Sequence, residues 1–249
     1  MSGAQIVYGL HPVRALLARH PERVREVRIA ERREDPRARE IATLAREHGR
    51  PVRRVDAEAL HRMVGDVAHQ GVVAEIEPIR PWSEDDLLGA LEHAVNPLIL
   101  ALDGVQDPHN LGACLRSADA CGALAVVTPR DRAAQLTPAA RKVAAGAAET
   151  TPLVRCTNLV RTLKLLKQAG LWLFAAAADA PRTAYEADLS GGAVLVLGAE
   201  GAGLRQLTRE TCDVSVRLPQ LGAVESLNVS VAAGMLLYEA VRQRAAKRR

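Results

Sequence analysis

Three polar stretches contain the residue types that could bind a ligand and carry out chemistry. They are residues 103–110, the glycine loop at residues 198–203, and residues 219–226. Each stretch follows a short apolar run of the kind that forms a buried strand, and each leads into a helical pattern. Ligands of parallel α/β sheets bind at the carboxyl ends of the strands, so we expect the three stretches to share one site.

The glycine loop, Gly198-Ala199-Glu200-Gly201-Ala202-Gly203, has the position of a nucleotide-binding loop between a strand and a helix. Glycine lets a backbone approach a ligand closely. However, the loop lies late in the chain and contains Glu200, which would repel a pyrophosphate, so a dinucleotide enzyme is disfavoured. A cationic or zwitterionic ligand, such as a sulfonium with an amino-acid tail, fits better. Glu200 could also be an ordinary solvated turn acid.

The third stretch leads into a long helix that begins with the polar residues Ser226, Asn228 and Ser230. Such side chains satisfy the free N–H groups of a helix start, where the helix dipole also favours negative charge. The following residues are apolar on nearly all sides, which predicts a buried helix. They include Val229, Val231, Ala232, Met235, Leu236 and Leu237. The same pattern also fits an ordinary capped core helix.

Other kinds of active site are poorly supported. The sequence has no Gly-x-Ser-x-Gly elbow, no metal-binding His or Cys spacing, and His109 is the one histidine within the three stretches. We therefore expect no metal and no covalent nucleophile. The four cysteines (Cys114, Cys121, Cys156 and Cys212) are expected to be unpaired and buried as small hydrophobic residues.

Length and composition indicate one large or two small domains with an ordinary globular core, since the chain has 249 residues, of which 48% are hydrophobic and 25% charged. Aromatic residues make up 2%, so stacking on bases cannot be the main mode of binding. The net charge of +4 favours a polyanionic partner. Most basic residues are Arg, which suits bidentate phosphate contacts, although a genome-wide bias toward Arg explains this equally well. No signal peptide or membrane span is apparent, and a cytoplasmic location is expected.

The chain divides into three parts. Residues 1–78 predict a small, Arg-rich α/β domain that could dock RNA or simply present a charged surface. Residues 79–96 predict a linker with one helical piece, and residues 97–249 the main domain. Strands alternate with helices in the main domain, which predicts a mostly parallel sheet with helices on both faces. There we expect Asn110 to cap a helix over Leu111–Cys121, Arg116 to point away from its apolar face, and one helix to span Gln135–Ala148.

Taken together, the three stretches resemble the motifs of the SpoU (TrmH) family of RNA ribose 2′-O-methyltransferases, in the SPOUT superfamily. The motifs are Asp103 to Cys121, Leu197 to Leu204, and Leu218-Pro219 followed by Glu225 to Ala232. The stretches Tyr8 to Val13 and His69 to Ala74 resemble the substrate-binding domain of the subgroup that methylates a P-loop guanosine of 23S ribosomal RNA. Nearly the whole chain is covered by this resemblance.

The resemblance implies a trefoil-knotted α/β domain with an L30-like N-terminal domain, acting as a homodimer on 23S rRNA or a large-subunit assembly intermediate. The methyl donor would be S-adenosylmethionine. The implied catalytic residues are Asn110, Arg116, Glu200, Ser226 and Asn228; the implied cofactor-binding residues are Gly198, Gly201, Leu218 and Leu227; and the implied RNA contacts are His69, Gln70 and Arg116.

Within this set we assign Glu200 and Asn228 to orienting the loops, and Asn110 and Ser226 to the ribose or cofactor end. An arginine is almost never deprotonated, so we prefer Arg116 as a clamp on a phosphate or the 2′-oxygen rather than as a general base. Two other functions remain open: a tRNA ribose 2′-O-methyltransferase, and a non-catalytic RNA-binding factor for ribosome assembly.

Overall fold

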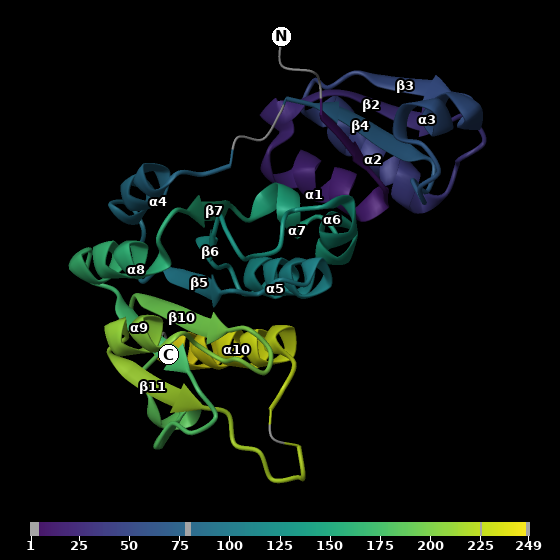
Figure 1. Ribbon diagram of the computed structural model, residues 1–249. Helices are drawn as coiled ribbons and strands as arrows, with labels where there is room; N and C mark the ends of the chain where they lie inside the picture. The colour runs from purple at the N-terminus through teal and green to yellow at the C-terminus, as the bar shows by residue number, and fades with distance from the viewer. Residues whose placement is uncertain (1–4, 78–80, 225, 248–249) are drawn as a thin grey trace. The chain divides into compact units, whose positions relative to one another are not determined.

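The computed structural model describes residues 5–77, 81–224 and 226–247 (Figure 1). The chain forms two compact units. The smaller unit contains the described residues up to 77 together with residues 145–150, and the larger one contains residues 81–144 and those from 151 onward. Each unit has its own sheet.

The smaller unit is built on a four-stranded sheet with the strand order β1-β4-β2-β3. Its elements are β1 (Gln5–Tyr8), α1 (Leu10–Arg19), β2 (Val24–Ala30), α2 (Pro36–Glu47), β3 (Val52–Val55), α3 (Ala57–Val64), β4 (Val72–Ile76) and, from the later segment, α7 (Ala147–Thr150). β1 and β2 both pair with β4 in antiparallel fashion, whereas β2 and β3 are parallel. Buried side chains of α1 and α2, such as Leu16 and Ile41, form the core with the sheet.

The larger unit contains a seven-stranded sheet with the order β7-β6-β5-β10-β8-β11-β9, in which every strand pair is parallel. Its elements are α4 (Glu84–Leu91), β5 (Leu98–Asp103), α5 (Pro108–Ala120), β6 (Ala125–Pro129), α6 (Pro138–Ala144), β7 (Leu153–Cys156), α8 (Leu159–Gln168), β8 (Trp172–Ala176), β9 (Arg182–Thr183), β10 (Ala193–Gly198), α9 (Gln206–Thr211), β11 (Val214–Arg217) and α10 (Val229–Lys247). The predicted parallel sheet is confirmed.

Helices cover both faces of this sheet, as predicted. On one face, Ile99 and Ala101 of β5 join a core cluster with Leu87 of α4 and with Leu159 and Leu163 of α8. Neighbouring residues of a strand point to opposite faces, and all of β5 is buried, so the other face is covered as well. There α10 packs on β10 and contacts α5. None of the helices in the described ranges is long and apolar enough to cross a membrane.

Several local predictions were wrong. The helix predicted over Gln135–Ala148 is divided into α6 and α7, because Ala145 and Gly146 have φ angles of 52° and 103°, which no helix can contain. Three strands were missed: β1, β7 and β9. These are short, with four, four and two residues, so too few residues alternate to give a clear pattern.

The long C-terminal helix, α10, is not buried all round as its composition suggested. Val231, Met235 and Tyr238 are 50%, 44% and 57% exposed. They lie three or four residues apart and therefore form a stripe on one side of the helix. Because α10 packs on the sheet through Leu236 and Leu237, the stripe faces away from the core of its own chain.

Candidate functional site

The first polar stretch follows β5, the neighbour of β10, whereas the second and third meet in the larger unit at the carboxyl ends of β8, β10 and β11. A cavity of about 500 Å³ lies there, a size typical of small-molecule sites. It is lined by residues 176–179 after β8, residues 197–204, residues 216–218 and 220 after β11, Ser226, Leu227, and Arg209, Val229, Ala232 and Leu236 from the helices. The four sequence-predicted cofactor residues, Gly198, Gly201, Leu218 and Leu227, all line this cavity.

The glycine loop is folded tightly onto the end of β10. Ala199 and Gly203 exchange backbone hydrogen bonds of 3.1 and 2.9 Å. A Cβ atom on Gly198 would lie 2.0 Å from the carbonyl carbon of Gly203, so only glycine fits at that position. Gly201 and Gly203 have φ angles of 74° and 66°, which favour glycine. The loop therefore presents backbone groups to the cavity at close range.

A side chain from each of the first two stretches and one from just after the third form one hydrogen-bonded cluster. The amide nitrogen of Asn110 donates to Glu200 Oε1 at 3.1 Å. The amide nitrogen of Asn228 donates to the same Glu200 oxygen and, at 3.0 Å, to Asn110 Oδ1. Asn110 is buried, whereas Glu200 and Asn228 are exposed, so the cluster has a solvent-facing side. Glu200 also lines the cavity and so connects it to both asparagines.

Asn228 also starts α10, as predicted for a polar residue at this position. Its Oδ1 accepts hydrogen bonds from the backbone N–H groups of Ser230 and Val231, at 2.9 and 3.3 Å, and from the Ser230 hydroxyl at 2.6 Å. The side-chain oxygen of Asn228 thus caps the helix, while its side-chain nitrogen donates hydrogen bonds to Asn110 and Glu200. Ser226 lies outside the helix, exposed, and lines the cavity.

Asn110 is not the helix cap that the sequence suggested. The cap of α5 is Asp107, whose carboxylate accepts from the His109 N–H at 2.9 Å, and Pro108 occupies the first helical turn. Aspartate at the cap and proline just inside the helix are both favoured choices. Asn110 therefore lies within the first turn, and its side chain is free to reach Glu200 and Asn228.

Three of the charged residues that line the cavity, Arg209, Arg217 and Glu200, have different kinds of partner. Arg209 forms an ion pair with Asp179 at 2.9 Å. Arg217 Nη1 donates to the carbonyl oxygens of Ala180 and Pro181 at 2.7 and 2.5 Å. Among the residues that the structure describes, Glu200 is bonded to the neutral side-chain amides of Asn110 and Asn228. Arg209 is therefore neutralised, whereas Glu200 keeps a negative charge and Arg217 a positive charge at the cavity, so that Glu200 favours a cationic group of the ligand and Arg217 an anionic one.

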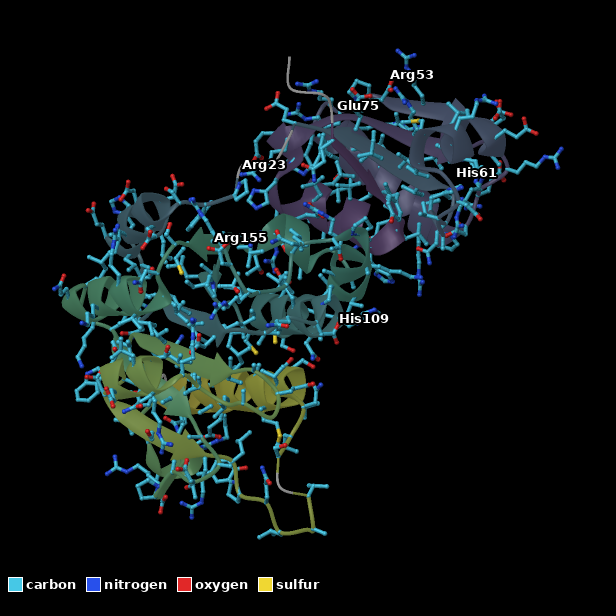
Figure 2. The ribbon with its side chains drawn as sticks, viewed as in Figure 1. Arg23, Arg53, His61, Glu75, His109 and Arg155 are labelled. Atoms are coloured by element: carbon cyan, nitrogen blue, oxygen red, sulfur yellow. The ribbon has the colours of Figure 1, made fainter. Side chains whose placement is uncertain are left out.

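Arg116 is not brought into this cluster. It is exposed on α5, does not line the cavity, and lies six residues beyond Asn110, which is about 9 Å along the helix and on a different side of it. His109, labelled in Figure 2, is also exposed, in the first turn of α5. Arg116 shares the outward side of α5 with His109 and Ala120, since these exposed residues recur at helical spacing.

His69 and Gln70 lie in the smaller unit, where both bond to the backbone. Gly71 N–H donates to His69 Nδ1 at 3.1 Å, which leaves Nε2 of the neutral ring as a donor. Leu10 N–H donates to Gln70 Oε1 at 3.3 Å, at the start of α1. The unit also presents charged side chains on its sheet, including Arg53 and Glu75 (Figure 2).

The sequence interpretation missed an ion pair directly beneath the glycine loop. Asp103, at the end of β5, has a fully buried side chain and accepts from both the backbone and the guanidinium of Arg205. The available signal was an acid at the end of an otherwise apolar strand, which must find a partner if it is buried.

No group of three or more His, Cys, Asp or Glu side chains is arranged to hold a metal ion within the part of the chain that the structure describes. The cysteines are free; Cys114 and Cys156 are buried, whereas Cys121 and Cys212 are only partly so, which corrects the expectation for these two. Burial raises the pKa of Cys121 to about 11 and that of Cys114 and Cys212 to about 12.

Comparison with known proteins covers both units. A family model described as the SpoU rRNA Methylase family matches residues 97–238, and one described as RNA 2′-O ribose methyltransferase substrate binding matches residues 6–82. Among curated relatives, 23S rRNA (guanosine-2′-O-)-methyltransferase RlmB of Pseudomonas syringae pv. tomato is 52% identical with full coverage of both chains. The protein of that name from Escherichia coli K12 is 47% identical over 97% of this chain and 99% of its own.

Solved structures of SpoU enzymes also match this chain. The SpoU methyltransferase AviRb from Streptomyces viridochromogenes, in complex with the cofactor AdoMet, matches with a TM-score of 0.76 and 25% identity over 98% of this chain and 92% of its own. The A. aeolicus TrmH/SpoU tRNA modifying enzyme matches with a TM-score of 0.57 and 29% identity, over 66% of this chain and 85% of its own.

Proposed function

Because this chain belongs to the SpoU rRNA methylase family, we propose that it transfers a methyl group from S-adenosylmethionine to the ribose 2′-hydroxyl of a guanosine in 23S ribosomal RNA. The family resemblance assigns the guanosine to the P-loop of the peptidyl-transferase centre. The expected setting is ribosome assembly in the cytoplasm, with 23S rRNA or a large-subunit intermediate as the substrate.

The observation that carries this proposal is the connection between cavity and cluster through Glu200. The cavity is lined in part by the folded glycine loop, which can hold a ligand through backbone groups. The cluster of Asn110, Glu200 and Asn228 shares Glu200 with the lining of the cavity. A donor bound in the cavity and a ribose at the solvent-facing cluster would thus lie on either side of Glu200.

The residues present fit S-adenosylmethionine. Backbone groups at Gly198, Gly201, Leu218 and Leu227 would hold it, since all four residues line the cavity. When bound, it would supply a methyl group on a cationic sulfur; as the ribose oxygen takes this methyl group, the sulfur would be left as a neutral thioether and the hydroxyl proton would pass to solvent. Glu200 favours the cationic donor electrostatically, and its bonds to two asparagines hold it in one orientation.

The role of the cluster in the reaction is to position Glu200 and the bound reactants. Asn228 and Asn110 fix Glu200, and the rigid start of α10 fixes Asn228 in turn. Ser226, exposed at the cavity, would contact the donor or the ribose. Correct orientation of bound reactants can supply roughly 7–11 kcal/mol of a barrier in the best cases, so a cluster that positions the reactants can contribute a large part of the rate.

We assign Arg116 to binding substrate rather than to the cluster, as a clamp on a phosphate or on the developing charge at the 2′-oxygen. In the smaller unit, His69 and Gln70 remain the predicted RNA contacts, and the Nε2 donor of His69 would be the group involved. Phosphate contacts would dominate binding, so affinity for RNA should fall steeply with salt.

A homodimer completes the proposal. α5 and α10 lie side by side on one sheet face, so their exposed stripes face the same way. The α10 stripe of Val231, Met235 and Tyr238 gives this surface an apolar centre, and Arg116 of α5 belongs to the same surface. Pairing of two such surfaces would bury the apolar stripe and bring Arg116 to the interface. The knotted chain path implied by the resemblance remains a prediction.

The smaller unit favours ribosomal RNA over tRNA. The substrate-binding model matches residues 6–82, while two tRNA-modifying structural neighbours match only 66% and 61% of the chain. A tRNA ribose methyltransferase is therefore the second candidate. A non-catalytic assembly factor is disfavoured because the cavity and the complete cluster are both present.

The test is methyl transfer from labelled S-adenosylmethionine to two transcripts, the P-loop domain of 23S rRNA and unmodified tRNA, followed by nucleotide analysis. 2′-O-methylguanosine in the ribosomal fragment alone is the expected result. Signal in tRNA alone would overturn the rRNA assignment. Donor binding without transfer to either transcript would make an assembly intermediate the substrate, and no donor binding would favour the assembly factor.

A further inference from the structure

We propose that Asp103 and Arg205 form a positioning pair that holds the glycine loop in its ligand-binding conformation. Neither residue lines the cavity or belongs to the cluster. The inference rests on the proposed function, because it assigns these residues to binding of S-adenosylmethionine. Their effect would be exerted through residues 198–204, the chain segment that runs from Gly198, the strand neighbour of Asp103, to Arg205.

The geometry of the pair is that of a fixed attachment. Asp103 Oδ2 accepts from the Arg205 backbone N–H at 3.1 Å, and Oδ1 accepts from Arg205 Nε at 2.7 Å and from Nη2. The Asp103 side chain is fully buried, whereas that of Arg205 is 57% exposed. A buried carboxylate is stable only with good partners, so this carboxylate strongly prefers the conformation in which Arg205 is in place.

The same aspartate marks the start of the loop. Gly198 and Asp103 are paired neighbours at the ends of the parallel strands β10 and β5. The chain leaves β10 at Gly198, turns back through the Ala199–Gly203 pairing, and reaches Arg205. Both ends of the loop are therefore tied to Asp103: one end through the sheet, the other through the side chain.

The attachment of both loop ends to Asp103 matters for ligand binding, because ordering a free loop costs conformational entropy. If the pair is removed, the loop would populate its binding conformation for only a fraction of the time, and the apparent Kd rises in inverse proportion to that fraction. Glu200 lies within the loop, so the cluster would lose its orientation as well. We therefore expect weaker donor binding and a lower kcat, with little change in the affinity for RNA.

A second strand-end carboxylate provides a matched control. Asp213, just before β11, accepts from the Leu173 backbone N–H at 2.9 Å and pairs with Lys167 at 2.5 Å. Its side chain is 17% exposed and it does not line the cavity. It thus has a backbone partner and a basic partner like Asp103, but it lies before its strand, whereas the cavity lies after the strands.

The experiment measures binding of S-adenosylmethionine by calorimetry to the wild type and to the variants Asp103→Asn, Arg205→Ala, Arg205→Lys and Asp213→Asn, with circular dichroism to confirm folding. Arg205→Lys keeps the test informative if Asp103→Asn or Arg205→Ala does not fold, since it leaves a positive charge beside the buried Asp103 carboxylate. Steady-state assays give kcat and the separate KM values for donor and RNA.

For Asp103→Asn and Arg205→Ala we expect a donor Kd raised by about tenfold, as for a loop that is ordered a tenth of the time, with an unchanged KM for RNA. Arg205→Lys should recover part of the loss. Asp213→Asn should lower the melting temperature without changing the donor Kd. In a double variant of Asp103 and Arg205, the effects should not add, because both changes break one interaction.

Two outcomes would overturn the inference while leaving the function intact: donor affinities of the Asp103 and Arg205 variants that equal the wild-type value, or an equal loss in Asp213→Asn, which would indicate general destabilisation. Failure of the wild type to bind S-adenosylmethionine would instead overturn the proposed function itself.

Discussion

Asn228 donates its side-chain amide to the carboxylate of Glu200, and its amide oxygen accepts from two backbone N–H groups at the start of α10. One side chain therefore connects the glycine loop to the long C-terminal helix. The orientation of Glu200 depends on a residue whose own position is fixed by helix capping. These two contacts explain why an asparagine is required. The helix cap needs an oxygen that accepts hydrogen bonds, and the carboxylate of Glu200 needs an N–H group that donates one.

An Asn228→Asp variant separates the two tasks. Aspartate caps helices as well as asparagine does, so the melting temperature should change little. The substitution replaces the amide N–H group of Asn228, which donates a hydrogen bond, by a second carboxylate beside Glu200. The resulting misplacement of Glu200 should lower kcat by about 100-fold. Thermal unfolding and methyl-transfer rates measure the two effects. A large loss of stability with normal kcat would contradict this division of roles.

A Gly198→Ala variant should lose binding of S-adenosylmethionine. The added methyl group would overlap the backbone of Gly203, so the loop could not fold onto the strand end. Gly191→Ala is the control, since a Cβ there would meet nothing within 4 Å. Calorimetric titration of both variants checks the prediction. Wild-type affinity in Gly198→Ala would show that the loop does not form the ligand site.

An Arg116→Lys variant distinguishes a clamp from a simple cation. A bidentate clamp on phosphate depends on the planar guanidinium, so we expect kcat/KM for RNA to fall by at least about tenfold, corresponding to about 1.4 kcal/mol, with an unchanged Kd for the donor. Single-turnover assays at saturating donor measure the loss. Near-wild-type activity would mean that a positive charge alone suffices.

A Met235→Asp variant should disrupt the proposed dimer. The side chain lies on the exposed stripe of α10, so the monomer should still fold, but a charge in the apolar centre of the interface would be unpaired. Leu207→Asp on α9 is the control, since Leu207 is also exposed, at 62%, and lies outside the stripe. Sedimentation velocity should show a monomer for Met235→Asp and a dimer for Leu207→Asp and the wild type.

The cysteines should react slowly in the native protein. Burial raises the pKa of Cys121 to about 11, so at pH 8 roughly one molecule in a thousand carries the thiolate. A thiol whose pKa is raised in the folded state stabilises the fold below the unfolded value of about 8.5, and this contribution is lost as the pH rises toward 11 and 12. Ellman's reagent at pH 8 should label the native chain far more slowly than the unfolded one, and urea midpoints should fall between pH 8 and pH 10.

Parts of the fold could be predicted because their signals are local. The continuous apolar runs of β5 and β10 correctly predicted buried parallel strands. Three polar stretches at strand ends correctly predicted one shared location, since parallel strands end on one edge of a sheet. The start of α5 was misassigned because Asp107 and Asn110 are both good caps, and the choice between them depended on Pro108.

The sequence by itself determined the longer strands, the parallel sheet and the residues at its carboxyl edge, because burial and chain reversal leave a periodic pattern in neighbouring residues. Tertiary structure alone decided which of those residues touch. Asn110 and Asn228 are 118 positions apart, and Asp103 and Arg205 are 102 apart. It also decided that α10 keeps an uncovered apolar stripe. A local pattern reports that a side chain is buried or capped, but the identity of its partner depends on the path of the whole chain.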